Sequence, residues 1–513
     1  MRLSDLTLAL AASPAAANPL QWVKRQFPWF GGGGGGPVGG TISLDPATTH
    51  QTMDGFGFSL AFQRANLITN NPSEQYQREL LDLLFSRETG AGFSILRNGI
   101  GSSLSSDSDW MNTIAPEDPG SPDAEPVYQW DGKDSGQLWV SQQAVEKYGV
   151  TQIYGNAWSP PYYMKTNNNE NNGGGLKPEW YQAFANYLVQ YVKFYAQEGV
   201  NLTHLGPMNE PDFAASYASA QWNGAQAAEF IKVLHATLER EGLDSQVKIA
   251  CCESAGWGNQ ANMLGAINSA GAGDLLGAVT THTYMGAPQG TLDTQAPVWF
   301  SEQCDLNGQW STAWTGGGAG AGLTWANNVM DAVINHNAGG YLYWEGVQWP
   351  NPNTNEKIIK VDEDTGEYEV ASRLWALANW SRFVRPGAVR ISTDGGEGLR
   401  IAAFKNVDES IAVVLISQGG SGDVTINAGD SAPAGGVARA WVSDETRQCE
   451  ETEVSGEGGE VVVNIPASSI VTVYFAAAAE AEEPAEETPT GGVAEGTSVG
   501  DDLPVESYVS AEP

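Results

Sequence analysis

Between Thr52 and Phe383, short apolar runs alternate with longer segments whose apolar residues recur at helical spacing. This alternation predicts a parallel sheet, because each parallel strand must be followed by a crossover before the next one begins. We expect eight strands, at 55–61, 93–98, 151–157, 204–209, 247–253, 279–284, 298–302 and 340–344. We expect helices at 74–87, 137–148, 179–198, 225–241 and 323–335. The pattern favours the α/β fold class and a (β/α)8 TIM barrel.

After Pro386 the pattern changes to short β-branched runs separated by turns rich in Gly, Asp and Ser. Such runs predict an antiparallel β-sandwich. The strands are expected at 399–404, 411–415, 424–426, 437–442, 461–465 and 471–475. An early strand-like segment, Gly40–Leu44, is expected to supply an edge to the same sandwich.

Four segments follow from these patterns. Residues 1–40 are expected to hold a signal or pro-segment and a Gly-rich linker, and residues 41–386 the catalytic barrel, with 41–52 contributing to the sandwich. The sandwich is expected at 387–476 and an acidic disordered tail at 477–513, because the tail lacks apolar periodicity. Residues 1–17 fit either a poor secretory signal or an imperfectly predicted start codon.

Composition excludes several classes of partner. The chain has 25 Lys+Arg against 61 Asp+Glu, a formal net charge of −36, so we expect neither nucleic acid nor an anionic membrane surface as a partner. No run of about 18 apolar residues is present, so no bilayer-spanning segment is expected. We expect a secreted, extracellular monomer.

Cysteines and sequons bear on secretion. Four cysteines, at 251, 252, 304 and 449, leave the disulfide pairing open, although the adjacent pair Cys251-Cys252 is not expected to bridge easily. The sequons at Asn201 and Asn379 would accept glycans in the secretory route. No metal-ligand spacing is visible, so neither a metal nor another cofactor is expected.

Two glutamates at strand ends carry the candidate chemistry. Glu210 ends His204-Leu-Gly-Pro-Met-Asn-Glu-Pro211, and Glu302 ends Val298-Trp-Phe-Ser-Glu302. Barrel enzymes place catalysis at the carboxyl ends of their strands, and glycoside hydrolysis needs two carboxyl groups that flank the scissile bond. An isolated Glu is more often a helix cap or an ion-pair partner, but Asn-Glu-Pro and Trp-x-x-Glu three strands apart are much more specific.

Several motifs resemble glycoside hydrolase family 30, in particular its fungal xylanase-like and glucuronoxylanase-like subfamily. The resemblance extends from about residue 41 to about 476, and these stretches carry it: Asp54-Gly-Phe-Gly-Phe-Ser-Leu-Ala-Phe-Gln-Arg64, Asn156-Ala-Trp-Ser-Pro-Pro161, Met164-Lys-Thr-Asn-Asn-Asn-Glu-Asn-Asn172 and Asp305-Leu-Asn-Gly-Gln-Trp310. The resemblance implies a barrel with a side β-sandwich, and a retaining mechanism with Glu210 as acid/base and Glu302 as nucleophile.

The resemblance also implies roles for neighbouring residues. Arg97 and Tyr284 stand where the family places donors to the nucleophile, and Asn209 is expected to bind the sugar 2-hydroxyl. Trp158 and Trp344 end two strands and are expected to form an apolar platform under the sugar, core packing being the alternative. His282 is expected to be a satisfied core histidine rather than a residue that orients the site. For the loop aromatics, outer subsites and core cover stay equally open: Tyr162, Tyr163, Trp310 and Trp314.

The sugar is less determined than the mechanism. Arg64 stands where the resembling subfamily carries an Arg associated with the 4-O-methylglucuronosyl branch of xylan, and a guanidinium suits a carboxylate. The alternative is that Arg64 pairs with a nearby acid of the barrel. Leu60 stands where an acidic residue is expected, which puts the subsite around Arg64 in doubt.

The leading interpretation is a secreted retaining glycoside hydrolase that cleaves β-1,4-xylan. Decoration with glucuronosyl branches, and endo against xylobiose-releasing action, stay open. One alternative keeps the mechanism on β-1,6-galactan, β-1,6-glucan or a glucosyl lipid. An alternative of another class is a non-catalytic carbohydrate-binding protein.

Overall fold

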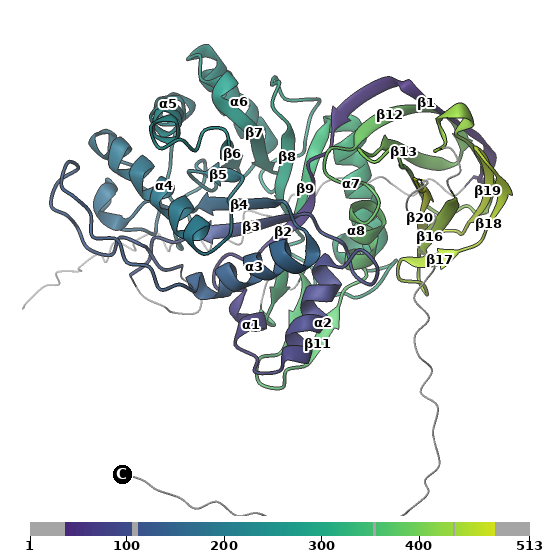
Figure 1. Cartoon of the computed structure of the whole chain (residues 1–513), viewed down its shortest axis with the longest axis horizontal. Coiled ribbons are helices and arrows are strands. Elements are labelled where there is room, and N and C mark those ends of the chain that lie inside the picture. The colour runs from purple at the N-terminus through teal and green to yellow at the C-terminus, as the bar shows by residue number, and fades with distance from the viewer. Residues whose placement is uncertain (1–35, 105–110, 352–354, 434–436, 478–513) are drawn as a thin grey trace, which may run out of the picture.

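A computed structural model describes residues 36–104, 111–351, 355–433 and 437–477. Figure 1 shows two bodies side by side, a barrel ringed by helices and an all-β body. The barrel confirms the predicted α/β class. Its eight parallel strands are β2 (Gly55–Ser59), β3 (Ile95–Ile100), β4 (Gln152–Ala157), β5 (His204–Gly206), β6 (Lys248–Ser254), β7 (Leu276–His282), β8 (Val298–Gln303) and β9 (Ala338–Gln348).

The barrel closes because β9 pairs in parallel with both β8 and β2. Its interior is filled by side chains from different strands, among them Tyr154, Trp299 and Leu342. Gly340 is required on β9, since a Cβ there would stand 2.6 Å from the indole of Trp299. Beyond β9 the sheet is extended by β10 (Lys357–Val361) and β11 (Tyr368–Val370).

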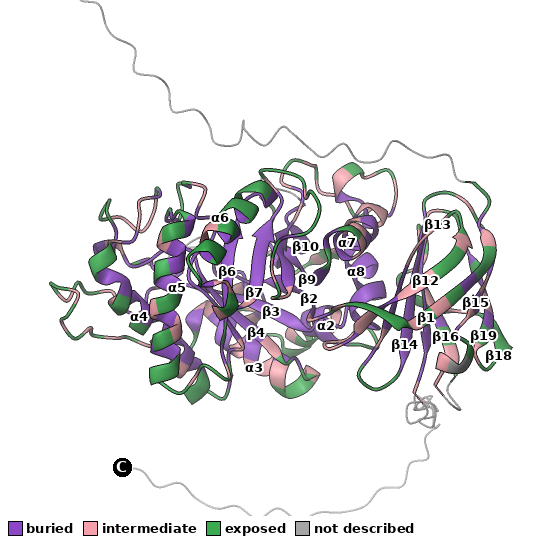
Figure 2. Cartoon of the chain, turned by 90° about the horizontal axis from the view of Figure 1, so that it is seen from above, coloured by how far each residue is buried: buried purple, intermediate pink, exposed green. Residues whose placement is uncertain are grey.

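Helices cover the outside of the barrel, with buried faces toward the strands and exposed faces outward (Figure 2). They are α1 (Asn66–Thr69), α2 (Glu74–Phe85), α3 (Gln137–Tyr148), α4 (Tyr181–Gln197), α5 (Gly224–Arg240), α6 (Trp257–Ser269), α7 (Gly322–His336) and α8 (Arg373–Ser381). The predicted helices correspond to α2, α3, α4, α5 and α7. Three were not predicted: α1 is only four residues long, α6 contains several Gly and Asn residues, and α8 is buried on all sides, so none of them shows an amphipathic pattern.

The second body is one ten-stranded, mostly antiparallel sheet curled on itself around an aliphatic core. Its strands are β1 (Gly39–Thr52), β12 (Val389–Glu397), β13 (Leu399–Lys405), β14 (Ile411–Ser417), β15 (Gly422–Asn427), β16 (Ala438–Ser443), β17 (Glu450–Thr452), β18 (Val454–Glu457), β19 (Glu460–Ile465) and β20 (Ser469–Phe475). The prediction that the N-terminal strand forms an edge was wrong: β1 pairs with β12 on one side and β15 on the other. Its exposed polar residues concealed how fully its backbone is paired.

Helices α7 and α8 lie between the two bodies (Figure 1), and both contact strands of the β-body. One predicted sequon lies at this junction. Asn379, on α8, is fully buried, and its amide donates to the Trp375 carbonyl and to Ser443 Oγ. The expectation of a glycan at Asn379 was therefore wrong, since a buried, bonded amide is not accessible. Asn201 is exposed.

Among the described residues, no helix is both long and apolar enough to cross a bilayer.

The placement of β1 in the β-body makes a stability prediction. Ile42 on β1 is fully buried in the aliphatic core of this body, whereas its neighbour Ser43 is exposed. We expect Ile42→Ala to lower the free energy of unfolding by about 2–4 kcal/mol through lost burial and the cavity left behind. Ser43→Ala, on the same strand, should change it by less than about 0.5 kcal/mol. Urea titration of both variants measures this, and equal effects would contradict the assignment.

Candidate active site

Charged side chains converge at the carboxyl end of the barrel. Arg97 is on β3, Glu253 on β6, His282 ends β7 and Glu302 is on β8, while Glu210 lies four residues beyond β5. Because all eight strands run in parallel, these positions open on the same face of the barrel. All five residues are buried. The predicted pair, Glu210 and Glu302, is therefore brought together as the alternation required.

A buried guanidinium joins three of the strands. Arg97 Nη1 donates to Glu302 Oε2 at 2.6 Å, and Nη2 donates to Asn209 Oδ1 at 2.5 Å and to Glu253 Oε2 at 3.1 Å. Because a guanidinium only donates, it fixes the amide of Asn209 with its oxygen toward Arg97. The nitrogen of that amide is then the group left to bind a ligand.

His282 links the carboxylates of the site to one another. Its Nδ1 lies 3.1 Å from Glu210 Oε1, and its Nε2 lies 2.6 Å from Glu253 Oε2 and 3.7 Å from Glu302 Oε2. Burial acts to lower the pKa of His282, but the charge of Glu302 and the bonds to Glu210 and Glu253 outweigh it and raise the pKa to about 10. The expectation of a core histidine was wrong: every hydrogen-bond partner of the ring is a site carboxylate, so His282 orients the site.

The two candidate catalytic carboxyl groups are close together. One oxygen of Glu210 and one of Glu302 lie within 4.8 Å of each other. Burial raises the pKa of Glu302, and the cations His282 and Arg97 oppose that effect. Tyr217, which was not predicted, donates to Glu210 Oε2 at 3.3 Å. The arrangement offers a bonded anion and a second carboxyl beside it, as two-carboxyl catalysis requires.

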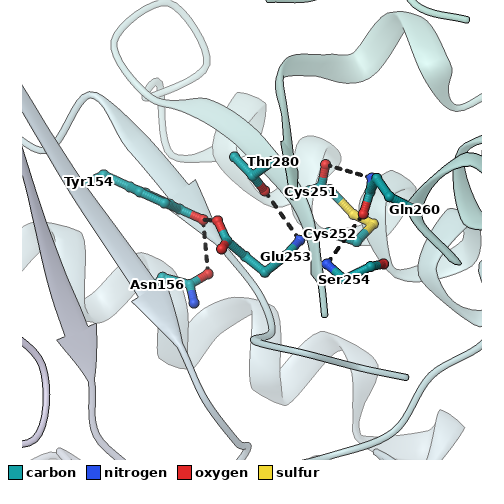
Figure 3. The surroundings of a disulfide bond; sticks show 8 residues. All are labelled: Tyr154, Asn156, Cys251, Cys252, Glu253, Ser254, Gln260 and Thr280. Atoms are coloured by element: carbon teal, nitrogen blue, oxygen red, sulfur yellow. Dashed lines mark hydrogen bonds between the residues drawn. A yellow bond between two sulfur atoms is a disulfide. The ribbon is translucent and has the colours of Figure 1, made fainter. Parts of the chain in front are cut away.

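Glu253 is the functional-site residue that sequence reasoning missed. It is fully buried, and it accepts hydrogen bonds from Arg97 and His282, from the Tyr154 hydroxyl at 2.7 Å and from Ser301 Oγ at 2.8 Å. Figure 3 shows its carboxylate next to the Tyr154 hydroxyl. The available signal was its place at the end of a predicted strand, but it has no distinctive neighbours comparable with Asn-Glu-Pro.

Comparisons with known proteins agree with this geometry. Residues 39–284 match the family model described as O-Glycosyl hydrolase family 30, and residues 387–473 match that of the family's beta sandwich domain. A solved structure, the catalytic domain of GH30 xylanase C from Talaromyces cellulolyticus, is 39% identical with a TM-score of 0.77. The alignment covers 85% of this chain and all of that domain.

The chain belongs to glycoside hydrolase family 30.

More distant relatives within the comparison differ in their named substrates. An endo-1,6-beta-D-glucanase of Neurospora crassa is 24% identical over 417 residues, which cover 73% of this chain and 80% of that protein. A glucuronoxylanase of Bacillus subtilis is 23% identical over 360 residues, which cover 65% and 77% respectively. Membership of family 30 thus establishes a glycoside hydrolase and leaves its sugar to be argued separately.

The two tryptophans assigned to a sugar platform do meet at the family 30 site. Trp158 and Trp344 stand with ring centroids 5.7 Å apart, and the Arg97 guanidinium lies 4.6 Å from the Trp158 ring. Their exposed fractions are only 2% and 9%. Their main contacts are therefore packing against Arg97 and Phe62, and they present a narrow edge to a ligand rather than an open platform.

Tyr284 was predicted to donate a hydrogen bond to Glu302, but its hydroxyl has a different partner. Its hydroxyl lies 3.2 Å from Cys304 Sγ, two residues after Glu302, and its ring packs edge-on to His282. The donors to Glu302 are instead Arg97 and, at longer range, His282. A strand-end position specifies the neighbourhood of a phenol but not the direction of its hydroxyl.

Arg64 has a partner within the barrel. Its Nε donates to Glu345 Oε2 at 3.0 Å, its Nη1 donates to the Phe62 carbonyl at 2.6 Å, and its guanidinium lies 4.0 Å from the ring of Trp349. Arg64 is 7% exposed. Of the two interpretations left open, the structure favours pairing with a nearby acid.

The loop aromatics divide between the two open readings. Trp314 is buried and donates to the Ser468 carbonyl, which makes it part of the contact with the β-body. Trp310 donates to Glu369 on β11. Tyr163 is buried, and Tyr162 packs edge-on against it. Trp314 and Tyr163 therefore cover a core.

The expectation for the adjacent cysteines was also wrong, since Cys251 and Cys252 form a disulfide on β6 (Figure 3). That expectation assumed the usual trans peptide, whereas the bond between these residues is cis. Cys304 and Cys449 are free thiols.

One set of potential metal ligands was not expected from the sequence. Ligand atoms of Glu210, His282 and Glu302 lie within 4.8 Å of one another. Both ring nitrogens of His282, however, already bond to carboxylates, and Glu302 is bonded to Arg97. These residues do not fit a metal ion, because a doubly bonded imidazole offers no lone pair and a guanidinium repels a cation.

The protonation of His282 predicts how stability depends on pH. Its folded pKa of about 10 lies above the ordinary 6.5, so its stabilisation is complete below about pH 6.5 and is lost as pH rises toward 10. Over that range the unfolding free energy should fall more steeply in the native protein than in His282→Gln, by up to about 1.4 kcal/mol per pH unit. Urea titrations at several pH values check this, and parallel curves would contradict it.

Proposed function

We propose that this family 30 hydrolase cleaves β-1,4-xylan with retention of configuration, with Glu210 as acid/base and Glu302 as nucleophile. The observation that carries the proposal is the separation of the two carboxyl groups, whose nearest ligand oxygens lie within 4.8 Å. Retaining enzymes hold these groups about 5–5.5 Å apart, whereas inverting enzymes hold them about 6.5–9.5 Å apart to admit a water molecule.

The steps follow from the contacts. Glu210 donates its proton to the departing glycosidic oxygen while the Glu302 carboxylate attacks the anomeric carbon and forms a glycosyl ester. Glu210, now ionised, takes a proton from water, which attacks the same carbon and releases Glu302. Arg97 donates to Glu302 and opposes the effect of burial on its pKa, and the amide nitrogen of Asn209 binds the 2-hydroxyl in this mechanism.

Xylan as the substrate is supported by the 39% identity to a family 30 xylanase. The relative named as an endo-1,6-beta-D-glucanase, at 24% identity, makes β-1,6-glucan the second candidate. We also propose secretion, which the Cys251–Cys252 disulfide supports, because disulfides persist mainly in oxidising compartments.

The assignment of the two glutamates predicts separable losses. Glu302→Gln should lower kcat on xylan by about 10³-fold or more while substrate still binds, since an amide cannot form the ester. Glu210→Gln should lose a similar factor on xylan but much less on a dinitrophenyl xylobioside, whose leaving group needs little protonation. Steady-state kinetics measures both, with the exposed Glu74→Gln as control. A carbohydrate-binding protein without catalysis would show no turnover in any variant.

Retention is tested by proton NMR of the first product, which should appear as the β anomer. An α anomer would contradict the nucleophilic role of Glu302. Mass spectrometry of products from xylan, β-1,6-glucan and β-1,6-galactan, offered in parallel, identifies the sugar, and products from another polymer alone would contradict the xylan assignment.

Because Arg64 is already bonded within the barrel, we expect that cleavage of xylan does not require a glucuronosyl branch. Its guanidinium already serves Glu345 and the Phe62 carbonyl, so a substrate carboxylate would have to compete with a buried ion pair. We expect kcat/KM on glucuronoxylan and on debranched xylan to agree within about threefold. Products with the branch at a fixed position, and no cleavage of debranched xylan, would contradict this.

A further inference from the structure

A third carboxylate lies beneath the catalytic pair and has no part in the steps above. Glu253 is fully buried on β6, and it bonds to both cations of the site, Arg97 and His282. The charge of Arg97 and the bonds from His282 and Tyr154 overcome the effect of burial and lower the pKa of Glu253 to about 2. A buried ionised carboxylate that contacts no substrate needs a reason for its presence.

The backbones of Glu253 and Glu210 are directly coupled. Glu210 and Glu253 both have left-handed backbones, with φ of 45° and 57°. The Glu210 N–H donates to the Glu253 carbonyl at 2.9 Å. Left-handed conformations are unfavourable for residues other than glycine and persist where surrounding contacts hold them, often at functional sites. The position of the acid/base backbone therefore depends on Glu253.

The charges of the site balance only when Glu253 is included. With the proton on Glu210, the cations are Arg97 and His282, and the anions are Glu302 and Glu253. Without Glu253 the buried group would carry one excess positive charge, which is costly at this depth. The site would relieve that charge by releasing a proton from His282.

The direction of the His282 bonds determines where the acid proton sits. A protonated imidazole donates from both nitrogens, to Glu253 from Nε2 and to Glu210 Oε1 from Nδ1. Oε1 then serves as acceptor, so the proton of Glu210 is placed on Oε2, whose remaining lone pair accepts the hydrogen bond from Tyr217. If the ring were neutral and donated to Glu253 from Nε2, its Nδ1 would carry a lone pair facing Glu210. That lone pair would attract the Glu210 proton to Oε1, away from the substrate.

We propose that Glu253 is a positioning residue that holds His282 as a cation and thereby keeps the acid proton of Glu210 on Oε2, ready for the leaving group. The proposal rests on the proposed function, because it presumes that Glu210 is the acid. Ser301 and Tyr154 complete the bonding of Glu253 and hold its carboxylate in place.

Three titratable groups close to this network stay neutral over the working range. Burial raises the pKa values of Tyr154 and Tyr284 well above 10, and that of the Cys304 thiol well above 9. Asp212, whose pKa burial raises, accepts hydrogen bonds from the Ala255 N–H and from Asn259. Glu356 on the β9–β10 side bonds to Gln348.

Glu253→Gln tests the proposal through the pH dependence of kcat/KM. The alkaline limb should move to lower pH by about one unit, because His282 then gives up its proton more easily. On xylan kcat/KM should fall about 100-fold or more, and on a dinitrophenyl xylobioside by less than about tenfold. Glu253→Asp, which keeps the charge, should restore the alkaline limb.

Ser301→Ala is the matched control. It removes one hydrogen bond from Glu253 Oε2, the oxygen that also bonds to Arg97 and His282, and it leaves the charge of Glu253 unchanged. Its alkaline limb should stay within about 0.2 pH units of the native protein. An unmoved limb in Glu253→Gln, with equal losses on both substrates, would overturn the proposal and leave Glu253 a purely structural residue.

A second measurement needs no known sugar. The ¹⁵N shifts of the His282 ring in the native protein should report protonation of both nitrogens from pH 6 to about pH 9, with His282→Gln used only to assign the signal. A ring that is neutral at pH 7 would overturn the proposal. If xylan is not cleaved while His282 is doubly protonated, the substrate assignment fails and the role of Glu253 does not.

Discussion

The fixed positive charge of Arg97 is the constraint on which the arrangement of this site depends. A guanidinium buried at the carboxyl end of a barrel cannot discard its proton, so burial is tolerable only if several acceptors surround it. Here there are three acceptors: Glu302 on β8, Glu253 on β6, and Asn209 in the loop after β5. Trp158 closes one face of the same cation. Closure of the barrel supplies this geometry, because only a closed sheet brings β3, β6 and β8 to a common centre.

Placing two carboxylates around one cation creates a second requirement, which His282 meets. A protonated ring between Glu210 and Glu253 converts a crowded group of acids into a balanced one. Without this cation, the three carboxylates would repel one another, and no single one of them would be favoured to carry the proton. In this arrangement the protonation states are assigned by position: Glu302 lies against Arg97, Glu253 lies against both cations, and Glu210 bonds to His282 and Tyr217.

Much of the fold was predictable because apolar residues recur along the chain at the spacings of strands and helices. Alternating strands and helices identified the barrel, and two glutamates with distinctive neighbours predicted the two carboxyl groups that the structure brings together. The predictions that failed concerned the direction in which side chains point. Nothing in the sequence around Tyr284 says that its hydroxyl turns to Cys304, and nothing around His282 says that both of its nitrogens meet carboxylates. Glu253 was missed because its partners come from β3, β4, β7 and β8, separations of 29 to 156 residues that no local motif records.

Arg64 and Arg97 show why partners rather than position decide what a strand-end arginine does. Both are buried at the mouth of the same barrel, and both touch a glutamate and a tryptophan. Glu302, the partner of Arg97, has a second carboxyl group, Glu210, beside it. A ligand can therefore be bound between Glu302 and Glu210. Glu345 bonds instead to Arg64 and Gln348, within a buried polar cluster that continues to Glu356. Arg64 is thus bonded to an acid inside that cluster. In a chain with a formal charge of −36, a cation committed in this way is not available to attract an acidic branch, which favours a neutral sugar backbone as the ligand.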